Sequence, residues 1–598
     1  MNNLKQNFFY PLLGLIISII FCVSIWDLIS LKYTNYHEII GEYSLKSHHN
    51  LNDTLRFIVF ITIPILVFFT IFLKTKNDND FNNLNFNIFF LKKDYSENKL
   101  LKKKFFYISF FSIILFFLGD WSVYPVQIFE DGISLSGSTL LEFEKKPWTD
   151  VYINTGFFYD MLNAKIAWLI TGFKTIGSFK FYIKFLNLIT LLCLFYFLNE
   201  ISNQIDSKSI KGHFFLLSSL SFIFIFKEVD IWRDLPLILF LIFILKYINT
   251  KNFTSIIIIS LLSVFTFFWS LDRGFFILFS LIPFLIFIFI NDKKELLKFL
   301  ITIFIFCLLI KLSIDPNILR EFFNHTKDIF TQHESLNGII HPKPFSDDAN
   351  SSRATKSLLL IIINFLISIL IIFNKKELFL KNTKFIFFFY SIINLLIYKS
   401  ALSRSDGGHI KMATYLSISL FVIFIIFFTL NYLSKKKEIL QQINKLNYVY
   451  VIFFILTLGI FTNSYKNVYE FPKNIKNYLT ANDELYLDKN YYSSIETIKK
   501  YFSEENCLQV FSYDQAIFYL LKKSSCSKFY NVWVIGSKKN QDIYIREIKL
   551  NKPKFILTGG ITEFKPLGER YPYIKNYIEK EYFLYETIGV WSILKKNL

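Results

Sequence analysis

The apolar run Phe105–Leu118 (FFYISFFSIILFFL) is followed, after one glycine, by Asp120–Tyr159, which reads DWSVYPVQIFEDGISLSGSTLLEFEKKPWTDVYINTGFFY. The first stretch is apolar enough to enter a bilayer, and the second is acidic and aromatic. Its carboxylates are Asp120, Glu130, Asp131, Glu142, Glu144 and Asp150. Holding such a segment at a membrane surface is costly, so the sequence predicts a functional loop directly after a membrane span.

The composition of the whole chain points to the same class of protein. Of its 598 residues, 53% are hydrophobic and 74 are Phe. Apolar runs of roughly 13–23 residues recur, and the longer ones match the thickness of a bilayer core. The sequence therefore predicts an all-α polytopic membrane protein with about 13 spans. We expect these spans at Phe8–Ser30, Phe57–Leu73, Phe105–Leu118, Phe181–Leu198, Phe214–Phe226, Leu235–Ile248, Ser255–Trp269, Phe275–Ile290, Phe299–Leu312, Ser357–Phe373, Phe385–Tyr398, Ala413–Leu433 and Tyr448–Phe461.

The segment Gly156–Gly172 decides the topology. Asp160, Asn163 and Lys165 interrupt its apolar pattern, so we expect an interfacial helix rather than a span. With a cytoplasmic N-terminus, the Lys-rich loops then fall inside, as the positive-inside rule requires. The net charge of +19 is spread over these short loops, which gives little support for nucleic-acid binding. The sequence predicts a bacterial inner-membrane protein.

The chain divides into three parts. Residues 1–104 form an N-terminal two-helix extension with a cytoplasmic loop, residues 105–463 a membrane core, and residues 464–598 a polar tail outside the membrane. In the tail, Ser494–Phe502 and Gln515–Leu521 are expected to be helices, and Cys507–Tyr513 and Lys554–Thr558 strands, which predicts an α/β domain. In an oxidising periplasm Cys507 and Cys526 could pair, and the sequence leaves this open.

Glu130 and Asp131 are the first candidates for catalysis. A carboxylate beside low-dielectric helices can have a raised pKa and act as a general base, and a pair can instead hold a divalent cation such as Mg²⁺ or Mn²⁺. The alternative interpretation is a solvated Asp-Gly turn. Further along, Asp150, Tyr152 and Asn154 interleave polar and aromatic groups before the interfacial helix, as a substrate site or a membrane anchor would.

The predicted outer loops also carry cations, and Arg233, Arg273 and Arg404 each have an aspartate within two residues. Arg233 lies in DIWRD and Arg273 in LDRG, while SRSDGGHIK contains Arg404, Asp406, His409 and Lys411. Positive residues are disfavoured on the outer face, and an anionic substrate such as a lipid phosphate would explain their presence. Orientation of helix ends by these side chains is the simpler alternative.

Together, Glu130-Asp131, KPWTD before Gly156, and an outer α/β tail with VFSYDQAIFYLL and KPKFILTGG resemble the GT-C superfamily of membrane glycosyltransferases. That superfamily includes protein mannosyltransferases and lipid A aminoarabinose transferases. The resemblance implies a core at 105–463 with a catalytic loop at 120–179 and a polyprenyl-phosphate sugar donor. It also implies inverting transfer to a lipid, glycan or protein, with Asp131 as the general base and Glu130 as second choice. The two spans before Phe105 depart from the family layout.

Two other functions stay open. A polymerase or ligase of lipid-linked glycans would place its essential Arg and His in one long outer loop, such as Ile314–Lys356. A transporter or flippase would carry charges within its spans and internal symmetry, and the sequence favours this least.

Overall fold

A computed structural model describes residues 2–75, 107–110, 112–114, 121, 123–205, 208–226, 229–373, 381–433, 464–562 and 566–597. The predicted span Tyr448–Phe461 and half of Phe105–Leu118 lie outside the described residues, as does Asp120.

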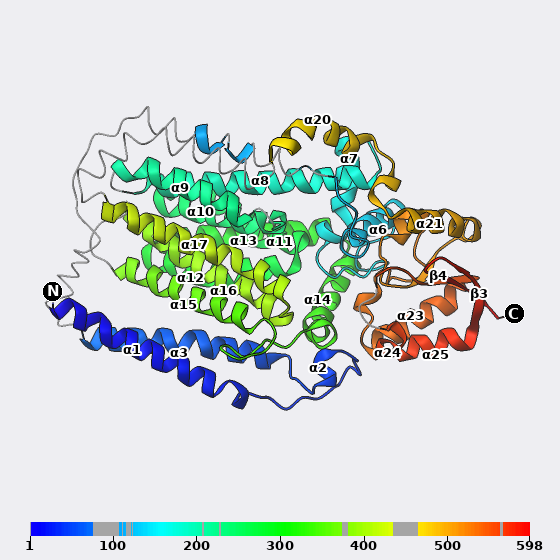
Figure 1. The fold of residues 1–598 in the computed structure, drawn as a ribbon, viewed down its shortest axis with the longest axis horizontal. Helices are drawn as coiled ribbons and strands as arrows, with labels where there is room; N and C mark the ends of the chain where they lie inside the picture. The colour runs from blue at the N-terminus through cyan, green and yellow to red at the C-terminus, as the bar shows by residue number, and fades with distance from the viewer. Residues whose placement is uncertain are drawn as a thin grey trace.

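Long apolar helices run side by side and form the body of the protein (Figure 1). Seven described helices are long and apolar enough to cross a membrane, namely α3 (Leu51–Thr75), α8 (Ile176–Asn203), α12 (Leu271–Asn291), α13 (Lys293–Ser313), α15 (Ser351–Phe373), α16 (Phe385–Ser403) and α17 (Gly407–Leu433). Others in the body are α1 (Asn2–Ser24), α9 (Lys208–Phe226), α10 (Leu235–Thr250) and α11 (Phe253–Trp269). The chain is thus a multi-pass membrane protein. The seven spans among the described residues are assigned by helix length and composition.

The N-terminal extension is a helix pair at one edge of this body. The helices α1 and α3 pack along each other, and α3 contacts α15 and α16 (Figure 1). Between them lie η1 (Trp26–Leu28) and the short α2 (Glu42–Leu45), which reaches toward α14 (Pro316–Asn337).

One end of the helical body faces the tail, and we call it the tail side. The elements α2, α6 (Glu130–Glu142) and α14 lie between the body and the tail (Figure 1). The tail side also carries η2 (Phe158–Leu162), α7 (Asn163–Thr171) and η3 (Trp232–Asp234). The turns at the other ends of α10, α11, α12 and α13 carry Lys251, Lys293 and Lys294.

The tail has the α/β fold that its sequence predicts. Its four-stranded sheet has the order β1-β2-β4-β3, with β1 parallel to β2 and the other pairs antiparallel. The strands are β1 (Gln509–Phe511), β2 (Phe555–Gly559), β3 (Tyr582–Ile588) and β4 (Trp591–Lys596). The helices are α20 (Ser464–Thr480), η5 (Asp483–Tyr486), α21 (Lys489–Tyr501), α22 (Ile517–Leu521), η6 (Val532–Val534), α23 (Lys538–Asn551), α24 (Leu567–Arg570) and α25 (Pro572–Glu581). A disulfide joins Cys507 to Cys526.

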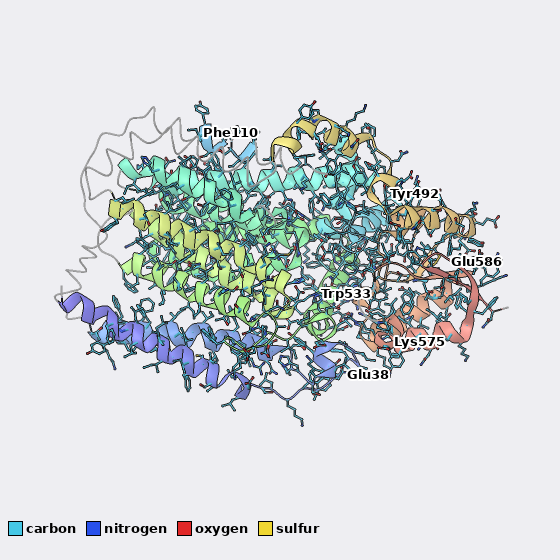
Figure 2. The ribbon with its side chains drawn as sticks, viewed as in Figure 1. Glu38, Phe110, Tyr492, Trp533, Lys575 and Glu586 are labelled. Atoms are coloured by element: carbon cyan, nitrogen blue, oxygen red, sulfur yellow. A yellow bond between two sulfur atoms is a disulfide. The ribbon has the colours of Figure 1, made fainter. Side chains whose placement is uncertain are left out.

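The tail is not a separate globule on a tether. Buried side chains of α6, α7 and the start of α8 form one hydrophobic core with those of α21, α22 and the sheet, as Leu135, Trp168, Phe179, Phe518 and Trp591 illustrate. Side chains fill the space between body and tail (Figure 2). Because burial of apolar area drives this association, the tail is held firmly over the tail side.

Candidate functional site

The segment predicted as one catalytic loop, 120–179, is largely helical. It contains α6, η2, α7 and the first residues of α8. The helix expected at Gly156–Gly172 corresponds to η2 and α7, whereas α6 was not predicted, because Gly132, Gly137 and several Ser residues are poor helix formers and packing favours the helix. A Cβ on Gly132 would lie 2.4 Å from the backbone nitrogen of Ala516, so glycine lets α6 approach the tail closely. Glu130 and Asp131 therefore occupy the first turn of a packed helix, where the helix dipole favours negative charge.

Asp131 already has close partners. Its Oδ2 accepts a hydrogen bond from the backbone N–H of Gln127 at 2.9 Å and lies 3.2 Å from Nζ of Lys180. The Lys180 side chain is buried and also contacts the carbonyl of Pro125 and the ring of Tyr124. The charge of Asp131 is thus neutralised by a fixed lysine.

Glu130 has a different environment. Its side chain is exposed to solvent at the start of α6. Loss of surrounding water raises the pKa of Glu130 above its usual value, and the charge of Asp131 adds to the rise. His409, Arg404 and Arg233 oppose it. The structure therefore brings five of the predicted site residues within electrostatic range of one another.

Arg233 and Arg273 form a row of ion pairs with Asp272 and Asp234, where η3 lies beside the first turn of α12. Nη2 of Arg233 lies 3.1 Å from Asp272 Oδ2 and donates to Ser270 Oγ at 3.1 Å. Arg273 donates to Asp234 at 2.7 Å and also pairs with Asp272. The Arg273 side chain is nearly buried between two carboxylates, which indicates a structural ion pair. Arg233 is more exposed and its guanidinium lies over the ring of Tyr159.

Arg404, Asp406 and His409 lie together at the turn between α16 and α17. Asp406 Oδ2 accepts from Arg404 Nε at 3.1 Å and is 2.7 Å from His409 Nδ1. Burial raises the pKa of Asp406, but the hydrogen bonds and charge of His409 and the charge of Arg404 outweigh it, so the net pKa is lowered. Lys411 is exposed in the first turns of α17.

The tail contributes aromatic and cationic groups that the sequence reading missed. The ring of Trp533 lies 5.5 Å from the Arg404 guanidinium and 4.6 Å from that of Arg570, and its ring centre is 5.3 Å from Phe129, next to Glu130. Such stacking holds Arg404 by a cation–π contact. Nothing in the sequence near Trp533 indicated this, because the contact joins positions far apart in the chain.

Asp160 is a further residue of this region whose environment the sequence did not indicate. It is fully buried, and its Oδ2 accepts the backbone N–H groups of Asn154 at 2.7 Å and Thr155 at 3.1 Å. Burial raises the pKa of Asp160 to about 6, against the effect of those hydrogen bonds. The sequence shows a carboxylate inside an otherwise apolar helical pattern. That pattern predicts that the segment does not span the membrane, but it does not predict a buried carboxylate.

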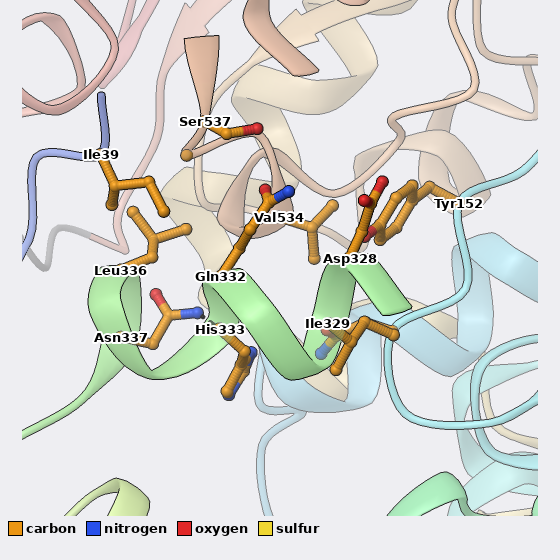
Figure 3. A pocket seen from close by; sticks show the side chains of 12 residues that line it. Ile39, Tyr152, Asp328, Ile329, Gln332, His333, Leu336, Asn337, Val534 and Ser537 are labelled. Carbon is orange, nitrogen blue, oxygen red and sulfur yellow. Dashed lines mark hydrogen bonds between the residues drawn. The ribbon is translucent and has the colours of Figure 1, made fainter. Parts of the chain in front are cut away.

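Tyr152 and Asn154 line a narrow pocket beside α14, together with Asp328, Gln332 and His333 (Figure 3). Figure 3 shows Asp328 next to Tyr152, and Gln332 turned toward Val534 of the tail. Burial, followed by the charges of Arg404 and Arg570, lowers the pKa of His333 to about 4, so this histidine is neutral at pH 7. The charge of Arg404 therefore acts on a histidine that lines this pocket. Asp150 instead closes a local turn by accepting the N–H of Lys146 at 2.9 Å.

A divalent-cation site at Glu130 and Asp131 was one expectation. Within the described parts of the chain, no three His, Cys, Asp or Glu side chains converge as potential metal ligands.

No protein-family model matches the sequence, and no curated protein matches it. Among solved structures, the chain is similar to the archaeal oligosaccharyltransferase AglB from Archaeoglobus fulgidus in complex with an inhibitory peptide and a dolichol-phosphate, at 10% identity over 83% of this chain and 74% of that one, with a TM-score of 0.44. It is also similar to ArnT from Cupriavidus metallidurans bound to undecaprenyl phosphate, at 8% identity over 82% of this chain and 97% of that one, with a TM-score of 0.44. At such identities and TM-scores, the likeness carries no argument about activity.

Proposed function

We propose that the protein is a membrane glycosyltransferase that moves a sugar from a polyprenyl-phosphate donor to an acceptor hydroxyl at the tail side. The observation that carries the proposal is Glu130, a solvent-exposed carboxylate with a raised pKa within the field of Arg233, Arg404 and His409. A base next to cations at the end of a multi-pass helical body suits a donor whose tail stays in the bilayer. The resemblance of the sequence to the GT-C superfamily supports the same reaction.

Glu130 is the better candidate for the general base, in place of the sequence-based first choice, Asp131. A general base must be accessible, and its pKa should lie near the working pH so that it is deprotonated before the reaction and can take up a proton during it. Glu130 is accessible and its pKa is raised, whereas Asp131 is occupied by Lys180 and the Gln127 N–H. Glu130 would accept the proton of the acceptor hydroxyl. At the same time the hydroxyl oxygen of the acceptor would bond to the anomeric carbon, from the face opposite the donor phosphate.

The bond that breaks joins the anomeric carbon to the phosphate oxygen, and the lipid phosphate leaves with the electron pair. Negative charge then grows on the phosphate, and fixed cations stabilise it most in the transition state. Arg233 and Arg404 suit this task because each is partly exposed. Arg273 would hold Asp272 and Asp234 in place rather than bind substrate. Tyr152, Asn154 and His409 remain candidates for contacts to the acceptor or the phosphate.

A polymerase or ligase of lipid-linked glycans is the second candidate, and one observation favours keeping it. That function was expected to use a histidine in Ile314–Lys356, and His333 on α14 lies in the field of Arg404. The two functions differ in their need for a carboxylate base. Removal of Glu130 would abolish transfer in the first case, whereas removal of His333 would do so in the second.

The test is a lipid and glycan profile of cells that lack the protein and are then complemented. In the deletion strain we expect a polyprenyl-phosphate sugar to accumulate and one envelope glycan to lose that sugar. Wild type and Glu142→Gln should reverse both changes, because Glu142 lies on the same helix but pairs only with Lys165 and Lys174 in the ion pairs described. Glu130→Gln should not. Restoration by Glu130→Gln would refute the proposed base.

A further inference from the structure

A buried polar cluster outside the candidate site joins the N-terminal extension to the rest of the protein. At its centre is Asp53, in the first turn of α3, with a side chain that is 1% exposed. The carboxylate lies 3.1 Å from Tyr43 Oη, 3.2 Å from His48 Nε2 and 3.3 Å from Arg56 Nη1, and it accepts the backbone N–H of His341 at 2.9 Å. A buried carboxylate needs such partners to offset its lost hydration.

From Asp53 the contacts lead directly to Arg404. His341 belongs to the segment 338–343 that follows α14, and Ile339 of this segment pairs alongside Arg404. The backbone N–H of Ser405 donates to the Ile339 carbonyl at 3.2 Å. Only one residue, Ile340, lies between His341 and Ile339, so a displacement of His341 would be passed on to Ile339.

The same cluster also holds the last turns of α16, which end at Ser403, directly before Arg404. Tyr43 Oη lies 3.2 Å from the Leu402 carbonyl, and His341 Nε2 lies 3.1 Å from Tyr398 Oη. Two sets of contacts therefore connect the Asp53 cluster to Arg404. One runs through the last turns of α16 and the other through Ile339.

Close packing of the extension leaves little freedom for this arrangement to shift. A Cβ on Gly41 would lie 2.3 Å from the Ser335 carbonyl oxygen, so the chain before α2 lies against the end of α14. On its other side, Lys538 of the tail donates its N–H to the His37 carbonyl at 3.1 Å. The N-terminal extension therefore packs against both α14 and the tail.

We propose that Asp53 is a positioning residue that holds Arg404 in place for binding of a lipid phosphate. The N-terminal extension then contributes to substrate binding through Arg404. The inference rests on the proposed function for the role of Arg404. Asp53 acts through His341 and Ile339 and does not itself touch the substrate.

The experiment measures binding of undecaprenyl phosphate to the purified full-length protein in lipid nanodiscs, together with hydrogen exchange of residues 400–410. Asp53→Asn weakens the hold on the His341 N–H and leaves Arg56 without its charge partner. We expect the Kd for undecaprenyl phosphate to rise about tenfold, as for loss of one charge-assisted contact. Exchange in residues 400–410 should become faster. Tyr43→Phe, a milder change, should shift both quantities in the same direction by less.

Two comparisons separate positioning from general destabilisation. In the double variant with Arg404→Gln, Asp53→Asn should weaken binding little further, because both changes remove the same contact. The control is Phe68→Ala, a buried position on α3 about 22 Å along the helix from Asp53, which should lower stability but leave residues 400–410 unchanged. Unchanged exchange at 400–410 in Asp53→Asn, or additive effects on Kd, would overturn the inference. Faster exchange in a protein that does not bind the lipid would instead retain the positioning and reject the proposed function.

Discussion

At the scale of single residues, the contrast between Glu130 and Asp131 shows how position on a helix sets chemistry. Successive residues point about 100° apart around a helix axis. Asp131 contacts the buried Lys180, whereas Glu130 is exposed and lies within the field of Arg233 and Arg404. The sequence could identify the pair as candidates, but the choice between them depends on Lys180, which lies 49 positions further along the chain.

The pH dependence of transfer tests the role of Glu130. A general base works only when deprotonated, so the rate should fall as the pH drops through the pKa of Glu130. Arg404 lowers this pKa by favouring the charged form, and Arg404→Gln should therefore move the acidic fall in rate to higher pH. Asp131→Asn should move it to lower pH, because the charge of Asp131 raises the pKa of Glu130. The measurement is the rate of sugar transfer in membranes against pH, and identical profiles would contradict the assignment.

Asp160 gives a prediction for stability. Its carboxyl keeps a proton up to about pH 6 in the folded protein but loses it near its usual, lower pKa when unfolded. The folded state then binds more protons between about pH 4 and about pH 6, so stability falls as the pH rises through this window and is level above it. The full fall amounts to about 3 kcal/mol for a shift of about two pKa units.

In Asp160→Asn this particular fall should be absent. An amide oxygen can still accept the N–H groups of Asn154 and Thr155, so the turn is retained. The check is the thermal unfolding midpoint of wild type and variant at about pH 4.5 and about pH 7. The two proteins should differ in their dependence on pH, and parallel midpoints would count against a raised pKa at Asp160.

At the scale of elements, sequence patterns predicted best where one element buries its own apolar face. The strands at Cys507–Tyr513 and Lys554–Thr558 and the helix at Ser494–Phe502 lie close to β1, β2 and α21. The strands β3 and β4 were not predicted, because exposed and charged residues such as Glu586 and Lys595 mask the usual strand pattern. The helix α6 was missed because its stability comes from packing against the tail.

The disulfide Cys507–Cys526 provides a prediction at this scale. It closes a loop with a sequence separation of 19, and in the chain-entropy model such a crosslink stabilises by about 3 kcal/mol. Cys507→Ser should lower the unfolding temperature of the purified protein and increase cleavage of the tail by trypsin. Reduction of wild type should have the same effect and should not affect the variant further. Equal melting of oxidised and reduced wild type would show that the crosslink adds no stability.

At the scale of the whole molecule, the candidate site is assembled from parts of the chain that no local pattern connects. Glu130 comes from α6, Arg233 from η3, Arg404 from the end of α16 and Trp533 from the tail. The sequence indicated most of the charged residues because they interrupt apolar runs at one face of the membrane. It could not indicate Trp533, Arg570 or Asp53, since buried aromatic and ionic contacts between distant segments leave no periodic signal.

The orientation of the whole protein is the remaining prediction. Lys251, Lys293 and Lys294 lie in the turns at the end of the helical body away from the tail, and the positive-inside rule places that end in the cytoplasm. A disulfide in the tail also suits an oxidising outer compartment. In a background without Cys22, Cys193 and Cys307, a membrane-impermeant maleimide should label Ser346→Cys on intact cells. Lys293→Cys should react only after lysis. The reverse pattern would place the candidate site in the cytoplasm, where Cys507 and Cys526 would be reduced, and the donor would then have to be used on the inner face.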